Sequence, residues 1–570
     1  MWYEIILILI IIAYGKIHAH QPVSAASFGH NFTLLFPSSN KWIAENPKIS
    51  VILMNPNAGR APVEIQYPKS IGSFSADFEK IIKVVEPMSY QEIVFNESLI
   101  NNCENATNKI LVECADSRIH ISSSYHRIAV LSHWYHPDAG DSFLVLPSSM
   151  ATNKYAFSAP APAEDGITTV YFLPQSNNAI IDVVGEINEE PFSNSFSPKL
   201  DNGNLMTIQT TGNLALIASA NVSFTVIVAV EKLPVSSNDN RTDFGVYMPT
   251  PLHHSGVKKF CSRINLKEAI FDCYNVSDYH IAILNNAKKF LVTRSDSYCD
   301  TEFTTINDMA NSVSYSLTEL YNEIEFVEYS QYIGFNTSSA ILQILQYGYD
   351  NELINGSFID LVASWSQFVT GLTTFFVPSD ENIVTIIGDA EATTSTISGN
   401  RIPIEFVWNW TPITFYQETF YYCTMSLPMG FYVITSNGSY TIFVAGQIQN
   451  AAYGFITAYN EQISKDLPEM KRTTTQPTTT TTQPTTTTQP TTTTQPTTTT
   501  TQPTTTTEIS SPYTTTMETA TVPITSSTEI TTIPVIPTTS KGSAEILYGV
   551  GLLLSTIITN LSLSLLNFYQ

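Results

Sequence analysis

Between Thr473 and Thr507 the chain consists almost entirely of threonine, glutamine and proline. Such a segment cannot bury enough apolar surface to offset the conformational entropy lost on ordering. Proline favours extended, polyproline-like conformers, and closely spaced threonine hydroxyls accept O-linked glycans in the secretory pathway. We therefore expect residues 473–540 to form a disordered, mucin-like, Thr/Pro-rich stalk of low complexity, which would reach about 200 Å if fully extended.

The N-terminus has the pattern of a secretory signal peptide. An apolar run from Ile5 to Ala13 is too short to span a bilayer, and Ile17-His18-Ala19 gives a small-residue exit. We expect residues 1–19 to be removed after Ala19. The alternative is an uncleaved signal anchor, because Glu4 stands where a basic residue is usual.

The C-terminal segment, residues 541–570, carries no charged side chain from Ile546 to Gln570. A terminal apolar tail behind small residues is typical of a GPI-attachment signal, and Gly542 and Ser543 are the candidate attachment positions. A tail-end transmembrane helix is the alternative, although no basic residue follows it. Either tail predicts a protein on the extracellular side of the plasma membrane.

The region between signal peptide and stalk is rich in acceptor sites for N-glycans, which agrees with export. The Asn-x-Ser/Thr motif occurs at Asn31, Asn96, Asn105, Asn221, Asn240, Asn275, Asn336, Asn355, Asn409 and Asn437. We expect a heavily glycosylated ectodomain. The formal net charge of the chain is −24, which makes nucleic acid an improbable partner.

Six cysteines lie in the same region: Cys103, Cys114, Cys261, Cys273, Cys299 and Cys423. An even number in an oxidising compartment predicts disulfides, with 15 possible connectivities. Cys103–Cys114 and Cys261–Cys273 would each close a short loop, which leaves Cys299 for Cys423. No cysteine or histidine spacing predicts a zinc site.

Two parts of the chain repeat in the same order. The segment IASANVSFTVIVA, residues 217–229, aligns without a gap on VITSNGSYTIFVA, residues 433–445, at a spacing of 216. Upstream, Val130-Leu131 matches Ile344-Leu345, and Ser142-Phe143 matches Ser357-Phe358 with one gap. Two matches in one order indicate a tandem duplication, with a first domain at 20–236 and a second at 237–472.

Each half has the sequence pattern of β-structure. Short β-branched segments bounded by turn residues include FTVIVAVE, YTIFVAG, AIIDVVGE and NIVTIIGD. We expect an all-β chain of two tandem, internally duplicated β-sandwich-like domains, followed by the stalk. One terminal helix, at residues 455–471, is predicted before the stalk.

The stretch YHRIAVLSHWYHPDAGDSFLVLPSSMATNKYAFSAP resembles the N-terminal domain family of IgGFc-binding protein: a strand, a Gly-Asp-Ser-Phe turn, a strand ending in proline, and a Tyr-containing strand. The segments ILQYGYDNELINGSFIDLVASW and FYVITSNGSYTIFVAGQIQNAAYGFITAYN fit the same pattern. The resemblance covers most of residues 25–460 and implies a surface, mucus-associated, non-enzymatic glycoprotein module. It carries over no determinant for antibody binding.

The turn HWYHPDAGDS is the candidate site for chemistry. His133, His136, Asp138, Asp141 and Ser142 are the residue types of a metal or hydrolytic site. The second half has no counterpart of either histidine, and turn hydrogen bonds would account for both aspartates. We therefore expect no catalytic, cofactor-binding or metal-binding residue, with a surface hydrolase or metal-dependent enzyme using this turn as the alternative.

These features predict a stalked cell-surface glycoprotein that binds an extracellular protein or glycan, mediates adhesion, or contributes to a protective layer. Its membrane contact is the C-terminal anchor. Trp365, Trp408 and Trp410 are expected to pack in the core rather than to form a sugar platform.

Overall fold

In the computed structural model every described residue belongs to the first of two compact units, Met1–Thr474 and Thr475–Gln570. The structure describes residues 25–38, 47–69, 78–101, 103, 110–200, 203–236, 239–252, 258–262, 270–274, 278–284, 289–295, 301–309, 311–325, 330–337, 341–348, 354–399, 408–415 and 418–460. The predicted signal peptide, stalk and C-terminal anchor lie outside these ranges.

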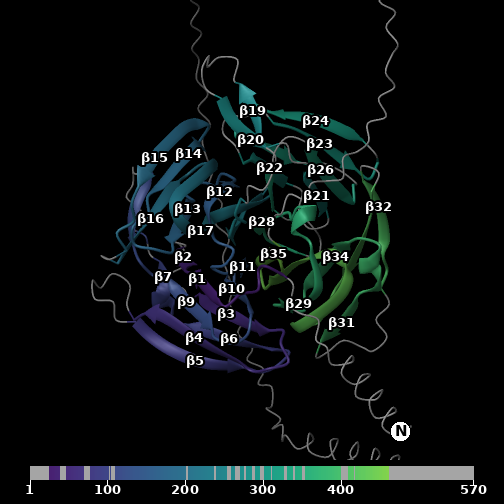
Figure 1. The fold of residues 1–570 in the computed structure, drawn as a ribbon, viewed down its shortest axis with the longest axis horizontal. Coiled ribbons are helices and arrows are strands. Elements are labelled where there is room, and N and C mark those ends of the chain that lie inside the picture. Colours follow the sequence, from purple (N-terminus) through teal and green to yellow (C-terminus); the bar gives the residue numbers. More distant parts are fainter. Residues whose placement is uncertain are drawn as a thin grey trace, which may run out of the picture. The chain divides into compact units, whose positions relative to one another are not determined.

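The described residues confirm an all-β chain (Figure 1). The helical elements that lie wholly within these ranges are short 3₁₀ turns: η2 (Glu97–Leu99), η4 (Trp365–Gln367) and η5 (Glu391–Thr394). In the described part of the chain no helix has the length and apolar character needed to cross a bilayer. The predicted helix at 455–471 is wrong at its start, because Phe455 and Ile456 end a strand; residues 461–471 are outside the described ranges.

The first half contains three antiparallel sheets. The first sheet has the order β1 (Asn31–Leu34), β9 (Ile119–Ser123), β4 (Ala61–Pro68), β5 (Phe78–Val85). The second has the order β11 (Ala139–Val145), β10 (Ala129–His136), β3 (Lys48–Asn55), β6 (Ser89–Phe95). The third has the order β15 (Glu190–Phe196), β14 (Ile181–Ile187), β17 (Leu214–Ser236), β13 (Thr168–Pro174), β16 (Asn204–Thr210), β8 (Leu111–Ala115), and β12 (Thr152–Ala159) and β18 (Asp239–Tyr247) also pair with β17. A short parallel pair joins β2 (Phe36–Pro37) to β7 (Ile100–Asn101).

The second half contains three corresponding sheets. The first has the order β21 (Asp278–Ile283), β26 (Tyr332–Thr337), β23 (Thr301–Asn307), β24 (Ser312–Leu317). The second has the order β28 (Ile359–Leu361), β27 (Leu342–Tyr347), β22 (Lys289–Arg294), β25 (Tyr321–Glu325). The third has the order β29 (Val369–Val377), β34 (Gly430–Ile448), β30 (Asn382–Gly388), β33 (Glu418–Met425), β32 (Thr411–Phe415), and β31 (Thr396–Gly399) and β35 (Ala451–Ile456) also pair with β34. A hairpin of β19 (Lys258–Ser262) and β20 (Ile270–Tyr274) lies between the halves in sequence.

The strand orders of the two halves agree sheet by sheet. Numbered along the chain within each sheet, both first sheets run 1-4-2-3 and both second sheets run 4-3-1-2. In the third sheets, β17 pairs with β12, β13, β14 and β18 as β34 pairs with β29, β30, β31 and β35. The pairing follows the 216-residue spacing, because β13 pairs with residues 224–230 of β17 and β30 pairs with residues 440–446 of β34. On the other side of these strands, Ala229 is opposite Val246, and Ala445 is opposite Gly454. β18 therefore pairs as part of the first half, although it begins after residue 236.

The buried hydrophobic clusters contain side chains from more than one sheet and from both halves. Side chains of the first and second sheets of the first half, such as Ile65 and Val51, lie in one buried cluster. The same cluster contains Ile281, Phe358 and Phe443 from the second half. Apolar burial is therefore continuous across the residue at which the sequence predicts a domain boundary.

Four strands meet in the middle of these sheets: β11, β18, β28 and β35 contact one another. Figure 1 shows β11, β28 and β35 surrounded by the other sheets. Glycine permits this close approach at Gly356 and Gly454, where a Cβ atom would overlap the Asp243 carboxylate and the Phe358 ring, respectively. The centre of the unit is therefore built from both halves.

Candidate functional site

The segment 133–142 is a hairpin at this centre rather than a surface loop. β10 and β11 are joined by the two-residue turn Pro137-Asp138, and His133 is directly opposite Ser142. Ser142 Oγ lies 2.7 Å from His133 Nδ1, which is hydrogen-bond distance. Ser142 is fully buried and His133 is 5% exposed, so neither group reaches solvent as a reactive pair would.

The buried imidazole belongs to a polar row across the second sheet. Ser50 of β3 is opposite His133 on its other side, and its hydroxyl donates to Glu92 Oε1 at 2.8 Å. Lys48 Nζ lies 2.6 Å from the same carboxylate, where the row reaches the surface. Burial, together with Lys48, lowers the pKa of His133 to about 4, against a smaller opposing effect of Glu92. The imidazole is therefore neutral at physiological pH.

Two of the three remaining residues of the predicted cluster, His136 and Asp138, make other contacts. His136 Nδ1 accepts from the backbone N–H of Asp138 at 3.3 Å, and Asp138 Oδ1 accepts from Asn450 Nδ2 at 3.1 Å. Among the residues that the structure describes, no three His, Cys, Asp or Glu side chains gather to hold a metal ion. The structure thus brings His133 and Ser142 together and leaves His136 and Asp138 outside the pair.

Asp141 is a strand residue, which corrects the prediction that a turn explains it. Its carboxylate is buried and accepts four backbone N–H groups. Oδ1 accepts from Ser142 at 2.8 Å and Gly454 at 3.3 Å. Oδ2 accepts from Val246 at 3.0 Å and Ile359 at 3.4 Å. One carboxylate therefore ties together all four central strands.

Asp243, on β18, makes the same kind of arrangement and was not predicted as a site residue. Its Oδ1 accepts from Gly140 and Phe244, both at 2.8 Å, in the first half. Its Oδ2 accepts from Ser357 at 3.0 Å and Ala452 at 2.8 Å, in the second half. Each oxygen of Asp243 thus serves one half of the chain.

The donors to these two carboxylates come in equivalent pairs. Leu131 is opposite Leu144 and Leu345 is opposite Leu361, so the hairpin register makes Ser142 equivalent to Ile359 and Gly140 to Ser357. This register corrects the sequence alignment of Ser142 with Ser357, which lacked any information on strand pairing. Val246 and Phe244 are likewise equivalent to Gly454 and Ala452.

Each carboxylate therefore lies where the two halves meet, and it accepts hydrogen bonds from equivalent backbone N–H groups of both halves. We call Asp141 and Asp243 the axial aspartates.

Burial dominates the electrostatics of this centre. It raises the pKa of Asp141 well above its ordinary value, and the neighbouring Asp243 adds to the effect. It raises the pKa of Asp243 to about 7 against the opposing backbone N–H bonds. Asp360 of β28, whose Oδ2 accepts from Ile456 N at 2.6 Å, also has a pKa raised to about 7 by burial. Surrounded by fixed donors, the axial carboxylates are placed to join strands rather than to attack a substrate.

The asparagines of the predicted glycosylation motifs lie mainly at the surface. Among the described residues, those with exposed side chains are Asn31, Asn96, Asn221, Asn240, Asn355, Asn409 and Asn437. Asn336 is half-buried, and Asn105 and Asn275 lie outside the described residues. Asn221 and Asn437, which are 216 residues apart, occupy equivalent positions on β17 and β34.

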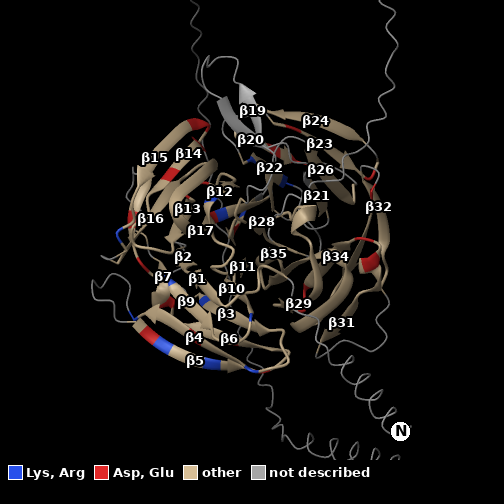
Figure 2. Ribbon diagram, in the orientation of Figure 1, with Lys and Arg blue, Asp and Glu red and all other residues tan. Residues whose placement is uncertain are grey.

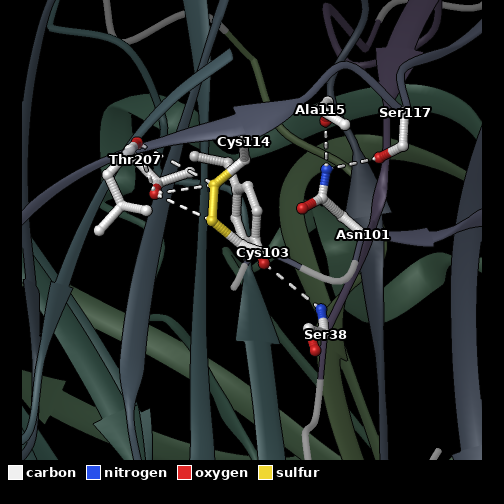
Figure 3. Close-up of a disulfide and its surroundings, with 9 residues drawn as sticks. Ser38, Asn101, Cys103, Cys114, Ala115, Ser117 and Thr207 are labelled. Carbon is white, nitrogen blue, oxygen red and sulfur yellow. Dashed lines mark hydrogen bonds between the residues drawn. A yellow bond between two sulfur atoms is a disulfide. The ribbon is translucent and has the colours of Figure 1, made fainter. Parts of the chain in front are cut away.

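The disulfide Cys103–Cys114 is present, as predicted (Figure 3). Its Cα atoms are 5.1 Å apart, and Thr207 Oγ1 lies 3.2 Å from Cys114 Sγ. Nearby, Asn101 Nδ2 donates to Ala115 O and Ser117 Oγ, both at 2.8 Å, which joins the chain before Cys103 to the chain after Cys114 (Figure 3).

Of the other predicted pairs, Cys261–Cys273 falls on two strands whose side chains lie outside the described part of the structure. In the hairpin β19–β20, Cys261 is opposite Phe271 and Cys273 is opposite Lys259, so the two cysteines are not directly opposed. Cys423 is a buried free thiol, and Cys299 is outside the described residues.

The three tryptophans pack against the cores. Trp365 lies against the cluster shared by both halves and contacts Phe368 and Phe420. Trp408 and Trp410 stack with ring centroids 5.4 Å apart and lie partly buried on the core of the third sheet of the second half.

Comparison with known proteins gives no relative on which to rest a function. No family model matches the chain, and no curated protein is similar to it. The resemblance to the N-terminal domain of IgGFc-binding protein stays a prediction, and the function has to be argued from the chain's own residues.

Proposed function

We propose that this protein is a stalked cell-surface glycoprotein whose β-rich head binds an extracellular protein or glycan, or shields the surface, without catalysis. The observation that carries the proposal is the exposure of seven motif asparagines on one compact β unit. N-glycans need acceptors at the surface, and a rigid β framework would hold them apart as a coat. The head would stand on an O-glycosylated stalk anchored through residues 541–570.

We further propose that the head is a tandem duplication of β-sandwich-like units. The matching strand orders and the common register of β17 and β34 support this reading. Facing sheets that contribute side chains to one core also support the sandwich. The axial aspartates would then fasten the two copies into one head.

The glycoprotein proposal is tested by expressing the full chain in secretory cells and treating it with an enzyme that removes N-glycans. We expect a large mobility shift, and a smaller shift for the Asn437→Gln variant than for the unsubstituted chain. The matched substitution Asn450→Gln, an asparagine on the neighbouring turn that is not in the motif, should leave the shift unchanged. A chain that carries no carbohydrate would refute the proposal.

The anchor is tested on intact cells with a phospholipase that cuts GPI anchors. Release into the medium supports the GPI anchor, and retention with surface exposure supports the transmembrane alternative. Recovery in the cytosol would contradict both. Replacement of residues 20–472 by an unrelated folded domain then separates binding, which should be lost, from a passive barrier, which should persist.

A surface hydrolase is the second candidate, and the His133–Ser142 contact favours it. A hydroxyl within 2.7 Å of a neutral imidazole has the distance of a nucleophile and its base. The test is ester hydrolysis by the Ser142→Ala variant, with Ser132→Ala, another buried serine, as the control. Activity in the unsubstituted protein that only Ser142→Ala removes would establish the hydrolase.

A further inference from the structure

The strand β5 forms an end of the first sheet, with β4 as its neighbour on one side. In an antiparallel sheet alternate N–H and C=O groups of an end strand point away from the sheet and can pair with another strand. β5 is also unusually apolar for an exposed strand. Phe78 is 48% exposed, Ile82 64% and Val84 48%.

Three charged residues, Glu79, Lys80 and Lys83, lie among these apolar ones. Figure 2 shows both acidic and basic residues along β5. Phe78, Lys80, Ile82 and Val84 share one face, and Glu79, Ile81 and Lys83 share the other because side chains alternate along a strand. Lys80 is paired within the sheet, since its Nζ lies 2.6 Å from Glu64 Oε2.

We propose that β5 pairs antiparallel with β5 of a second copy of this chain, across a two-fold axis at Ile81. In this register Glu79 is opposite Lys83 of the second copy, and Lys83 is opposite its Glu79. On the other face, Phe78 is opposite Val84 of the second copy. Moving the register by two residues in either direction removes both oppositely charged pairs.

Charge complementarity therefore favours β5 of a second copy as the strand that pairs with β5. A strand of unrelated sequence has no reason to offer a glutamate and a lysine at this separation, whereas β5 offers both to itself. A two-fold interface uses the same surface on both subunits, which this register satisfies. The pairing would extend the four-stranded sheet into one continuous sheet across the dimer.

The corresponding edge of the second half provides an internal contrast. β24 ends the equivalent sheet and reads SVSYSL, with no charged side chain. It therefore cannot form charge pairs with a copy of itself. A substitution there serves as the matched control.

The test is co-precipitation of two full-length copies that carry different epitope tags, co-expressed in secretory cells. The Glu79→Lys variant has lysine at both positions, and the Lys83→Glu variant has glutamate at both. Each variant should associate with itself at least about tenfold less than the unsubstituted chain, because two attractive cross-strand pairs become repulsive. A mixture of the two variants should associate about as well as the unsubstituted chain.

The association restored in the mixture of the two variants cannot come from an ion pair within one molecule. Residues 79 and 83 of a strand are about 13 Å apart, too far for a direct ion pair. Ser314→Lys on β24 should leave association unchanged. Two results would overturn the proposal. One is an unsubstituted chain that never associates with itself, which would mean that the lysines of β5 repel other strands. The other is that each variant associates with itself as well as with the other variant.

Discussion

Replacement of Asp243 by asparagine tests the claim that an axial carboxylate holds the two halves together. Asparagine has nearly the same shape, but its NH₂ group cannot accept the two N–H bonds that one carboxylate oxygen now accepts. In one orientation of the amide the donors left without a partner are Ser357 N and Ala452 N, at present 3.0 and 2.8 Å from Oδ2. A buried donor without a partner costs about 1–3 kcal/mol, so the loss should be about 2–6 kcal/mol.

That loss would be a large part of the usual folding free energy of about 5–15 kcal/mol. The assay is denaturant unfolding of the purified protein at pH 8, where Asp243 is ionised, followed by the fluorescence of its tryptophans. Asp182→Asn is the control, because Asp182 also lies in a strand but is exposed. If Asp243→Asn unfolds at the same denaturant concentration as this control, the carboxylate does not hold the halves together and the reasoning fails.

Three further predictions follow from burial and covalent structure. The pKa of Asp243 is raised to about 7 in the folded state from an ordinary 3.8, so the folded protein holds a proton more tightly than the unfolded chain does. This contribution to the free energy of unfolding is complete below about pH 4 and is lost as the pH rises through 7. Unfolding midpoints measured from about pH 5 to 8 should therefore fall, and less steeply in Asp243→Asn. The same sign applies to Asp360, so Asp360→Asn should also flatten the profile. Replacing Cys103 and Cys114 together by serine should lower the free energy of unfolding by about 2–4 kcal/mol, measured with the same denaturant assay. An unchanged midpoint in the double-serine variant would contradict a stabilising disulfide.

The strands could be predicted because their residues carry the signal locally. FTVIVAVE and YTIFVAG lie within β17 and β34, and AIIDVVGE and NIVTIIGD overlap β14 and β30. β-Branched runs with turn residues at their ends have few other ways to bury their side chains. The 216-residue spacing also carried over to the structure, because an ungapped alignment of two strands implies the same register against their neighbours.

The central contacts could not be predicted from the same signals. Asp243 ends the polar part of β18, DNRTD, and three of its four partners are 103 to 209 residues away in sequence. The sequence predicts a turn at Asp141 because Pro137 and Gly140 lie close to it, yet only Pro137 and Asp138 form the turn. The helix expected from 455 failed for a related reason: pairing of Phe455 with Val444 outweighs the local helical pattern.

Comparison of the two halves of the sequence also does not identify the axial aspartates as important residues. A residue needed by each copy would be expected twice, and the position equivalent to Asp243 is Ala451. A carboxylate that accepts from both copies at once is needed only once, and a second carboxylate at the same place would add repulsion without adding donors. The second half therefore needs no aspartate at the positions equivalent to Asp141 and Asp243. Where two copies meet, a residue can be required even though the other copy has no counterpart of it.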